Sequence, residues 1–126
     1  MPKLILIGLG GCCGAIARYT LAGVAHRWFS GTFPVGTLFV NVLGCLAIGV
    51  AMGLIEDKGV LGPQARSLLV IGFLGSFTTF SALGYETIEL LNDGQLAGVA
   101  LNLAGNVGLG LGAVVLGRLA VRAMIA

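Results

Sequence analysis

The sequence predicts an all-α integral membrane protein with four transmembrane helices. Only 10% of the 126 residues are charged and 57% are hydrophobic, whereas a soluble domain carries about 25% charged residues. The apolar residues gather in four long stretches that short polar segments separate. The 22 glycines indicate close packing between helices, because helices in lipid associate through small residues that let their backbones approach.

The four expected spans are residues 4–25, 35–55, 67–91 and 96–119. Each is close to the roughly 20 residues that a helix needs to cross a hydrocarbon core of about 30 Å. The linkers are 26–34, which contains interfacial Trp28 and Pro34, then 56–64, and the short turn 92–94. We expect residues 1–126 to form one domain. A domain this small encloses little besides its own packing, so we expect the functional site to lie between two subunits of a dimer.

The first span, 4–25, combines glycines with one charged side chain. Residues 3–14 imitate a dinucleotide-binding turn, but Cys13 stands where the third glycine of G-x-G-x-x-G is required. We therefore interpret these glycines as helix-packing residues. Arg18 lies toward the far end of the span, where a charge is costly unless it faces water, an anion or a partner. It either snorkels to the headgroups or forms a positively charged vestibule that gathers anions.

Pairs of glycines four residues apart predict helix contact faces, because i and i+4 lie on the same side of a helix. The pairs are Gly10/Gly14, Gly49/Gly53 and Gly108/Gly112. They fall in the first, second and fourth spans.

Three asparagines lie inside the second and fourth spans. Asn41 is in the second, and Asn102 and Asn106 lie four apart on one face of the fourth. A buried amide needs partners for its acceptor and for its donors. These amides either join helices to one another or line a polar route across the membrane.

The third span contains GFLGSFTTFSALGYE, residues 72–86, which places hydroxyl groups among aromatic rings. In a helix Phe73, Phe77 and Phe80 share one face, and such a stripe either packs in the core or forms a site. Glycines and adjacent β-branched threonines weaken helix formation here. We predict a broken helix whose freed backbone groups face protein, a cavity or an ion. Glu86, near the end of the span, either carries a proton or is solvated at the interface.

The charges predict an orientation and exclude some functions. The side of the membrane that holds both termini carries Lys3, Lys58, Arg66, Arg118 and Arg122, whereas the other side carries only Arg27. The positive-inside rule therefore favours cytoplasmic termini. The basic residues form no stripe for nucleic acid. The single histidine, His26, lies in a loop beside Arg27, so we predict that the protein is not an enzyme.

Three segments together resemble the CrcB/Fluc family of small bacterial fluoride channels. They are GGCCGAIARY (10–19), GTLFVNVLGCLAIG (36–49) and GFLGSFTTFSALGYE (72–86), and they fall in the family's order and in the matching spans. The resemblance implies an antiparallel, dual-topology dimer with two pores in the bacterial inner membrane. It further implies that fluoride leaves the cytoplasm passively and that a structural sodium ion lies at the dimer centre.

The resemblance also assigns expected roles by position. Arg18 would lie in the vestibule, Asn41 would donate a hydrogen bond in the pore, and Phe80 would present its ring to fluoride. The backbone carbonyls of Gly75 and Thr78 match those that hold the sodium ion shared by both subunits. The remaining expected pore residues are the hydroxyls of Thr79 and Ser81, the carboxylate of Glu86 beside the path, the ring of Phe77, and the amides of Asn102 and Asn106.

Three positions depart from the family pattern, and two other functions compete with a channel. Leu83 stands where a second pore phenylalanine is common, and Asn102 and Asn106 stand where tyrosine and serine are frequent. The main alternative is a proton-coupled small multidrug transporter, which needs a carboxylate in its first span, and 4–25 contains none. A non-transporting membrane subunit is the other. The charge bias leaves both a homodimer and a heterodimer with an oppositely biased chain open.

Overall fold

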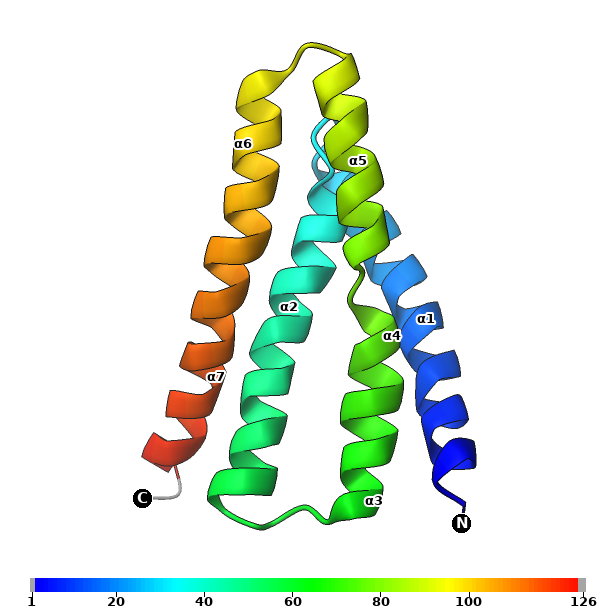
Figure 1. Ribbon diagram of the computed structural model, residues 1–126, viewed down its shortest axis with the longest axis vertical. Coiled ribbons are helices and arrows are strands. Elements are labelled where there is room, and N and C mark those ends of the chain that lie inside the picture. Colours follow the sequence, from blue (N-terminus) through cyan, green and yellow to red (C-terminus); the bar gives the residue numbers. More distant parts are fainter. Residues whose placement is uncertain (1, 125–126) are drawn as a thin grey trace.

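The chain folds into four long helical spans, which confirms the predicted fold class at this level. The computed structural model describes residues 2–124. The spans run Lys3–Trp28, Val35–Asp57, Pro63–Asn92 and Leu96–Met124. Each helix extends a few residues beyond its predicted apolar stretch, so His26 lies in the first helix and not in a loop as predicted. The spans alternate in direction, so both ends of the chain lie at the same end of the bundle (Figure 1).

Three of the spans are built from several helical segments. The first is a single helix, α1 (Lys3–Trp28). The second is α2 (Val35–Met52), followed by the π-helical turn η1 (Gly53–Asp57). The third contains α3 (Pro63–Ala65), η2 (Arg66–Leu74), α4 (Gly75–Phe77) and α5 (Phe80–Asn92). The fourth contains α6 (Leu96–Ala104), η3 (Gly105–Leu109) and α7 (Gly110–Met124).

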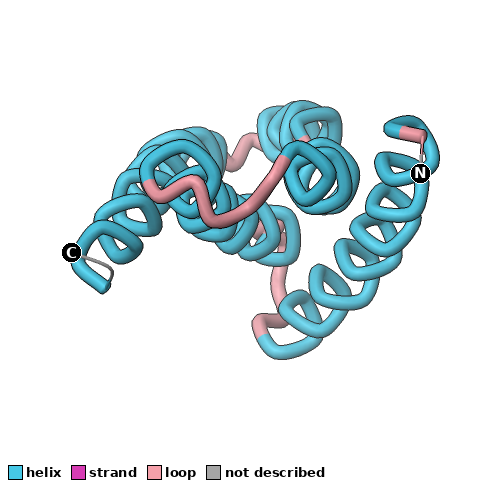
Figure 2. Tube along the Cα trace, turned by 90° about the horizontal axis from the view of Figure 1, so that it is seen from below, coloured by secondary structure: helices cyan, strands magenta, loops and turns pink. Residues whose placement is uncertain are grey.

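The second and third spans form the middle of the bundle. Figure 2 shows α1 on one side and the fourth span on the other. α1 packs on η2 and α4, α2 packs on α7, and α5 packs on α6. Large apolar side chains such as Ile16, Leu101 and Leu111 stay exposed on the outer faces. These faces suit contact with lipid or with another subunit.

Glycines set the close approach of α1 to the third span. A Cβ added at Gly14 would meet the backbone of Phe73, and one added at Gly10 would lie 2.9 Å from the Phe73 nitrogen. From the other side, a Cβ at Gly72 would lie 2.7 Å from the carbonyl oxygen of Ile7. Only residues without a side chain fit here, as the Gly10/Gly14 pair predicted.

The fourth span packs through a different glycine face from the one predicted. Gly49 and Gly53 do lie on the contact face of the second span, against Val114 and Val121. Gly108 and Gly112 instead have no neighbour within 4 Å of an added Cβ in the described part of the chain. The buried face of α7 consists of Gly110, Ala113, Gly117 and Val121. The 3.6-residue period places this face away from Gly108 and Gly112.

The predicted turn at 92–94 joins α5 to α6 with only three residues between the helices. Gly94 has φ of +73°, a left-handed conformation that glycine adopts without strain. Its N–H donates to the carbonyl of Leu91 at 3.0 Å, and the N–H of Gln95 donates to the carbonyl of Leu90 at 2.9 Å. These bonds close the end of α5 and fix where α6 begins.

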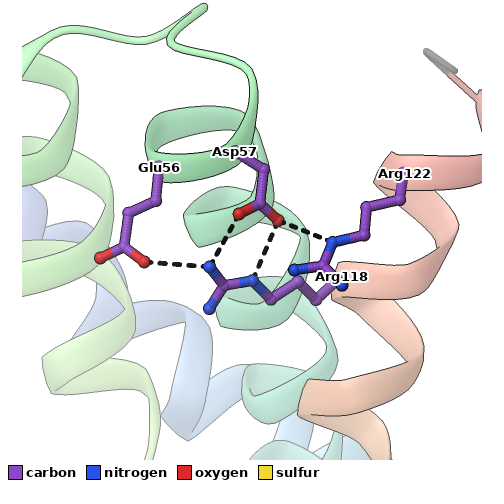
Figure 3. A network of polar contacts seen from close by, with 4 residues as sticks. All are labelled: Glu56, Asp57, Arg118 and Arg122. Carbon is purple, nitrogen blue, oxygen red and sulfur yellow. Dashed lines mark hydrogen bonds and ion pairs between the residues drawn. The ribbon is translucent and has the colours of Figure 1, made fainter.

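An ion-pair cluster joins the second and fourth spans at the end that holds the termini (Figure 3). Arg118 donates from Nη2 and Nε to both carboxylate oxygens of Asp57, at 2.8 and 3.0 Å, and from Nη2 to Glu56 at 3.2 Å. Arg122 donates from Nε to Asp57 at 3.2 Å. The side chains are partly solvated, so each pair contributes modest stability.

Candidate functional site

The third span is interrupted between α4 and α5, which Figure 1 draws as separate coils. Thr78 and Thr79 have extended backbones, with φ, ψ of −90°, 158° and −149°, 119°. The hydroxyl of Thr79 accepts a hydrogen bond from the N–H of Ala82 at 3.2 Å. Thr79 is therefore the N-cap residue of α5, a position at which a hydroxyl satisfies one of the helix's free N–H groups.

The interruption removes helical partners from backbone carbonyls in the middle of the span. In a continuous helix the N–H of Thr79 bonds the carbonyl of Gly75, but here it donates to Oδ1 of Asn41 at 2.8 Å. The N–H of Ala82, which would bond the carbonyl of Thr78, caps Thr79 instead. These two carbonyls thus lack their usual donors. Residues 2–124 contain no group of three His, Cys, Asp or Glu side chains that could hold a metal ion.

Arg18 contacts the end of α4 from the neighbouring span. Its Nε donates to the carbonyl of Ser76 at 3.1 Å, and in a continuous helix the N–H of Phe80 would occupy that carbonyl. A cation at the C-terminal end of a helix also interacts favourably with the helix dipole. Arg18 is half-buried, so one face of the guanidinium supports the break while the rest stays accessible.

Asn41 bridges α2 to the interruption with all of its amide hydrogens. Its Nδ2 donates to the carbonyl of Thr79 at 3.1 Å and to Oδ1 of Asn106 at 2.8 Å. Its Oδ1 accepts the N–H of Thr79. The two-point contact with Thr79 replaces helical bonding at the break. In this conformation Asn41 joins helices, and its donors face protein groups.

The amides of the fourth span continue this contact toward α5. Asn106 donates to Oδ1 of Asn102 at 3.1 Å and to its carbonyl at 2.8 Å. Asn102 donates to the hydroxyl of Thr87 at 3.0 Å, which donates to the carbonyl of Leu83 at 2.7 Å. We call Asn41, Asn106, Asn102 and Thr87 the amide ladder. Asn102 is fully buried and Asn106 is 8% exposed, so the prediction of one polar face on the fourth span is consistent with their contacts.

The interruption also separates two aromatic rings that helical spacing placed together. Phe77 is 3% exposed and stacks on Phe73, with ring centroids 5.7 Å apart. Phe80 is 84% exposed. Two extended residues reset the helical phase, so the expectation of one aromatic face including Phe77 is corrected: Phe77 is a core residue here. Leu83, at the position of the expected second ring, is buried in the core.

A cavity of about 500 Å³ lies between α1, α2 and α5 on the far side of the break from the chain ends. Arg18, His26, Thr37, Thr79 and Glu86 contribute to its lining. The hydroxyl of Thr37 donates to Oε1 of Glu86 at 2.6 Å. The other oxygen of Glu86 is buried and has no hydrogen-bond partner among the described residues. The cavity thus holds one cation and one carboxylate with an unused acceptor.

A second cavity, of about 360 Å³, lies on the other side of the interruption. Its lining includes Asn41, Gly75, Thr78, Thr79 and Phe80. Thr79 lines both cavities. Its hydroxyl lies 3.4 Å from that of Ser81, which is exposed. The interruption therefore separates two hollows, and hydroxyl groups stand at the boundary.

Two residues that the sequence interpretation did not select complete these contacts. Thr37 precedes Asn41 by four residues, so both lie on one face of α2, and this spacing could have indicated it. Thr87 follows Glu86 directly, but its contact with Asn102 crosses the α5–α6 turn. No periodic pattern in the sequence marks that contact.

The chain is similar to a known family over almost all of its length. A family model described as CrcB-like protein, camphor resistance (CrcB), matches residues 5–118. The chain belongs to the CrcB family. It is 46% identical over 117 residues to a protein of Nitratidesulfovibrio vulgaris strain Miyazaki F named fluoride-specific ion channel FluC, covering 93% of this chain and 94% of that one.

Other CrcB relatives carry the same description. A fluoride-specific ion channel FluC of Maridesulfovibrio salexigens is 43% identical over 125 residues, covering 96% of this chain and 99% of its own. FluC 1 of Methanosarcina acetivorans is 40% identical over 119 residues, with 94% and 90% covered. These names describe ion channels, and the family is not one of enzymes, as the sequence predicted. With four membrane-spanning helices, the chain is a multi-pass membrane protein.

Proposed function

We propose that this chain forms a fluoride-selective channel that passively releases fluoride from the cytoplasm. The observation that carries the proposal is the interruption at Thr78 and Thr79. At mid-span it presents the ring of Phe80 and the hydroxyls of Thr79 and Ser81, and Phe80 and Ser81 lie on a surface that the rest of the described chain leaves exposed. Full-length similarity to proteins named fluoride-specific ion channels supports the same function.

The proposed path begins in the cavity that contains Arg18. A guanidinium raises the local concentration of anions at the mouth of a pore. Fluoride is small and strongly hydrated, so the protein must replace its water with donors: the hydroxyls of Thr79 and Ser81 and the positive ring edge of Phe80. Glu86 lies beside this path. Asn106 and Asn102 support Asn41. Asn41 contributes to the path either by rearranging so that its amide donates to fluoride, or indirectly by holding Thr79 in place.

We further propose that the carbonyls of Gly75 and Thr78 hold a structural sodium ion. Neither carbonyl has its usual helical donor, because the N–H of Thr79 bonds Asn41 and the N–H of Ala82 bonds the hydroxyl of Thr79. Carbonyl oxygens are ligands for hard cations. Gly75 is exposed, which leaves room for carbonyls from a second subunit. A bound cation would offset the dipoles of the carbonyls at the helix break.

The proposed assembly is an antiparallel, dual-topology dimer with two pores in the bacterial inner membrane. Exposure of Phe80 and Gly75 supports it, because polar backbone and a pore ring at mid-membrane need cover from a second subunit. The charge bias leaves both a homodimer and a heterodimer with an oppositely biased chain open. Tagging both ends of the chain in cells that express it alone tests this: exclusively cytoplasmic tags would exclude the homodimer.

Passive efflux from liposomes tests the proposed function. Vesicles loaded with potassium fluoride or potassium chloride, with a potassium ionophore, are diluted into low-halide buffer and followed with an ion electrode. We expect fast fluoride efflux and little chloride efflux. Phe80→Ile should abolish fluoride efflux while the protein remains dimeric. Equal permeability to both anions rejects the proposal, and dependence on a proton gradient would favour the transporter.

A further inference from the structure

The amide ladder has a direction that its terminal group sets. Thr87 has a single hydroxyl hydrogen, and it donates this hydrogen to the carbonyl of Leu83. The oxygen of Thr87 can then only accept a bond from Asn102. Asn102 must therefore turn its NH₂ group toward Thr87, as is observed at 3.0 Å.

The same constraint passes along the ladder to Asn41. With its NH₂ committed to Thr87, Asn102 offers its Oδ1 to Asn106, whose NH₂ donates both to that Oδ1 and to the backbone carbonyl of Asn102. Asn106 then offers Oδ1, and Asn41 must turn its NH₂ toward Asn106. This leaves Oδ1 of Asn41 to accept the N–H of Thr79. Rotating any one of the three amide groups by 180° would make two N–H donors face each other.

The ladder therefore links the middle of α5 to its start. It begins at Thr87, two turns inside that helix, crosses to α6 and η3, and returns through α2 to Thr79 at the start of α5. Since Asn102 is fully buried, it is not exposed to either cavity in this conformation. A buried polar group at this depth is costly unless every hydrogen bond is made.

We infer that Thr87, Asn102 and Asn106 are positioning residues that fix the amide orientation of Asn41, and through it the extended backbone at Thr79 and the adjacent ring of Phe80. The inference rests on the proposed fluoride channel and adds to it. It gives the asparagines of the fourth span a role distinct from contact with the ion. The direction of the ladder predicts that a change at Thr87 alters the orientation of the Asn41 amide, although Asn106 and Asn102 lie between the two residues.

Thr87→Val and Thr87→Ser form the matched test. Valine keeps the shape of threonine but removes the hydroxyl, so Asn102 loses its acceptor, whereas serine keeps the hydroxyl. We expect Thr87→Val to lower fluoride efflux about tenfold, the effect of losing one well-formed hydrogen bond, and Thr87→Ser to restore it. The side-chain amide resonances of Asn41 in ¹⁵N-labelled protein should shift in the valine variant and stay in place in the serine variant.

The combined variant T87V/N102L keeps the test decisive if the single valine variant folds poorly. Removing both partners leaves no buried group unpaired at their contact, so folding should recover. Asn106 keeps the backbone carbonyl of residue 102 as an acceptor but loses the side-chain oxygen, so efflux should stay low. Equal efflux in Thr87→Val and wild type, or unmoved Asn41 resonances, overturns the inference. If wild-type protein itself passes no fluoride, the proposed function fails, and the Asn41 resonances alone then decide whether the ladder orients that amide.

Discussion

Replacing Gly14 by alanine is expected to push α1 away from the third span. An added Cβ would lie 2.9 Å from the carbonyl carbon and 3.0 Å from the Cα of Phe73, and it would also meet the carbonyl oxygen. All three are backbone atoms, so no side chain can rotate aside. Carbon atoms in ordinary contact are about 3.5–4.0 Å apart. The two helices must therefore separate locally by about 1 Å.

This separation should affect stability and transport together. Overpacking of this kind costs about 1–3 kcal/mol. Arg18 follows Gly14 by one helical turn, and the bond from its Nε to the Ser76 carbonyl is 3.1 Å long. Lengthening it to about 4 Å ends the hydrogen bond. Because the donor is charged, we expect a loss of about 1.5–3 kcal/mol in the support of the break, and fluoride efflux should fall at least about tenfold.

Gly8→Ala is the matched control on the same helix. An alanine Cβ there has no neighbour within 4 Å among residues 2–124, and alanine favours helix by up to about 1 kcal/mol over glycine. Urea unfolding in detergent micelles, followed by circular dichroism, measures stability, and the fluoride electrode measures efflux. Equal unfolding midpoints for the two variants would refute the close packing of α1. Normal efflux in a destabilised Gly14→Ala protein would refute the role of the Arg18 contact.

Three further predictions follow from the contacts. Thr37→Val should lower fluoride efflux several-fold because Glu86 loses the only hydrogen-bond donor that it has among the described residues, whereas Thr37→Ser should not; equal efflux rates would contradict this. Arg118→Ala should lower the free energy of unfolding by no more than about 1 kcal/mol, should leave efflux unchanged, and should lose its effect in 1 M salt as charges are screened. Replacing sodium by N-methylglucamine should lower the thermal midpoint of the dimer if the Gly75 and Thr78 carbonyls bind sodium; an unchanged midpoint would count against that site.

The membrane spans could be predicted because hydropathy accumulates over about 20 residues. Local exceptions such as Arg18 do not change such a sum. The phase of the third span could not be predicted, because it depends on the backbone of two residues. Once Thr78 and Thr79 are extended, the helical spacing that joined Phe77 to Phe80 no longer applies, and one ring lies in the core while the other is exposed.

For the polar residues, too, one part of the arrangement could be predicted from the sequence and another part could not. Asn102 and Asn106 could be placed on one face from their spacing alone, and the structure joins them by hydrogen bonds. Which groups they meet depends on how α6 lies against α2 and α5. The contact of Asn102 with Thr87 arises from the folding back of the chain, so only the three-dimensional arrangement reveals it.

The turn at Gly94 sets the register of this fold-back. The hydrogen bonds from Gly94 to Leu91 and from Gln95 to Leu90 fix the conformation of the whole linker between α5 and α6. One residue added inside the turn would rotate α6 by about 100° and carry Asn102 away from Thr87, unless the extra residue bulged outward. Evolutionary insertions and deletions are therefore expected in the linkers 29–34 and 58–62, and the shortest linker in the chain should keep its length.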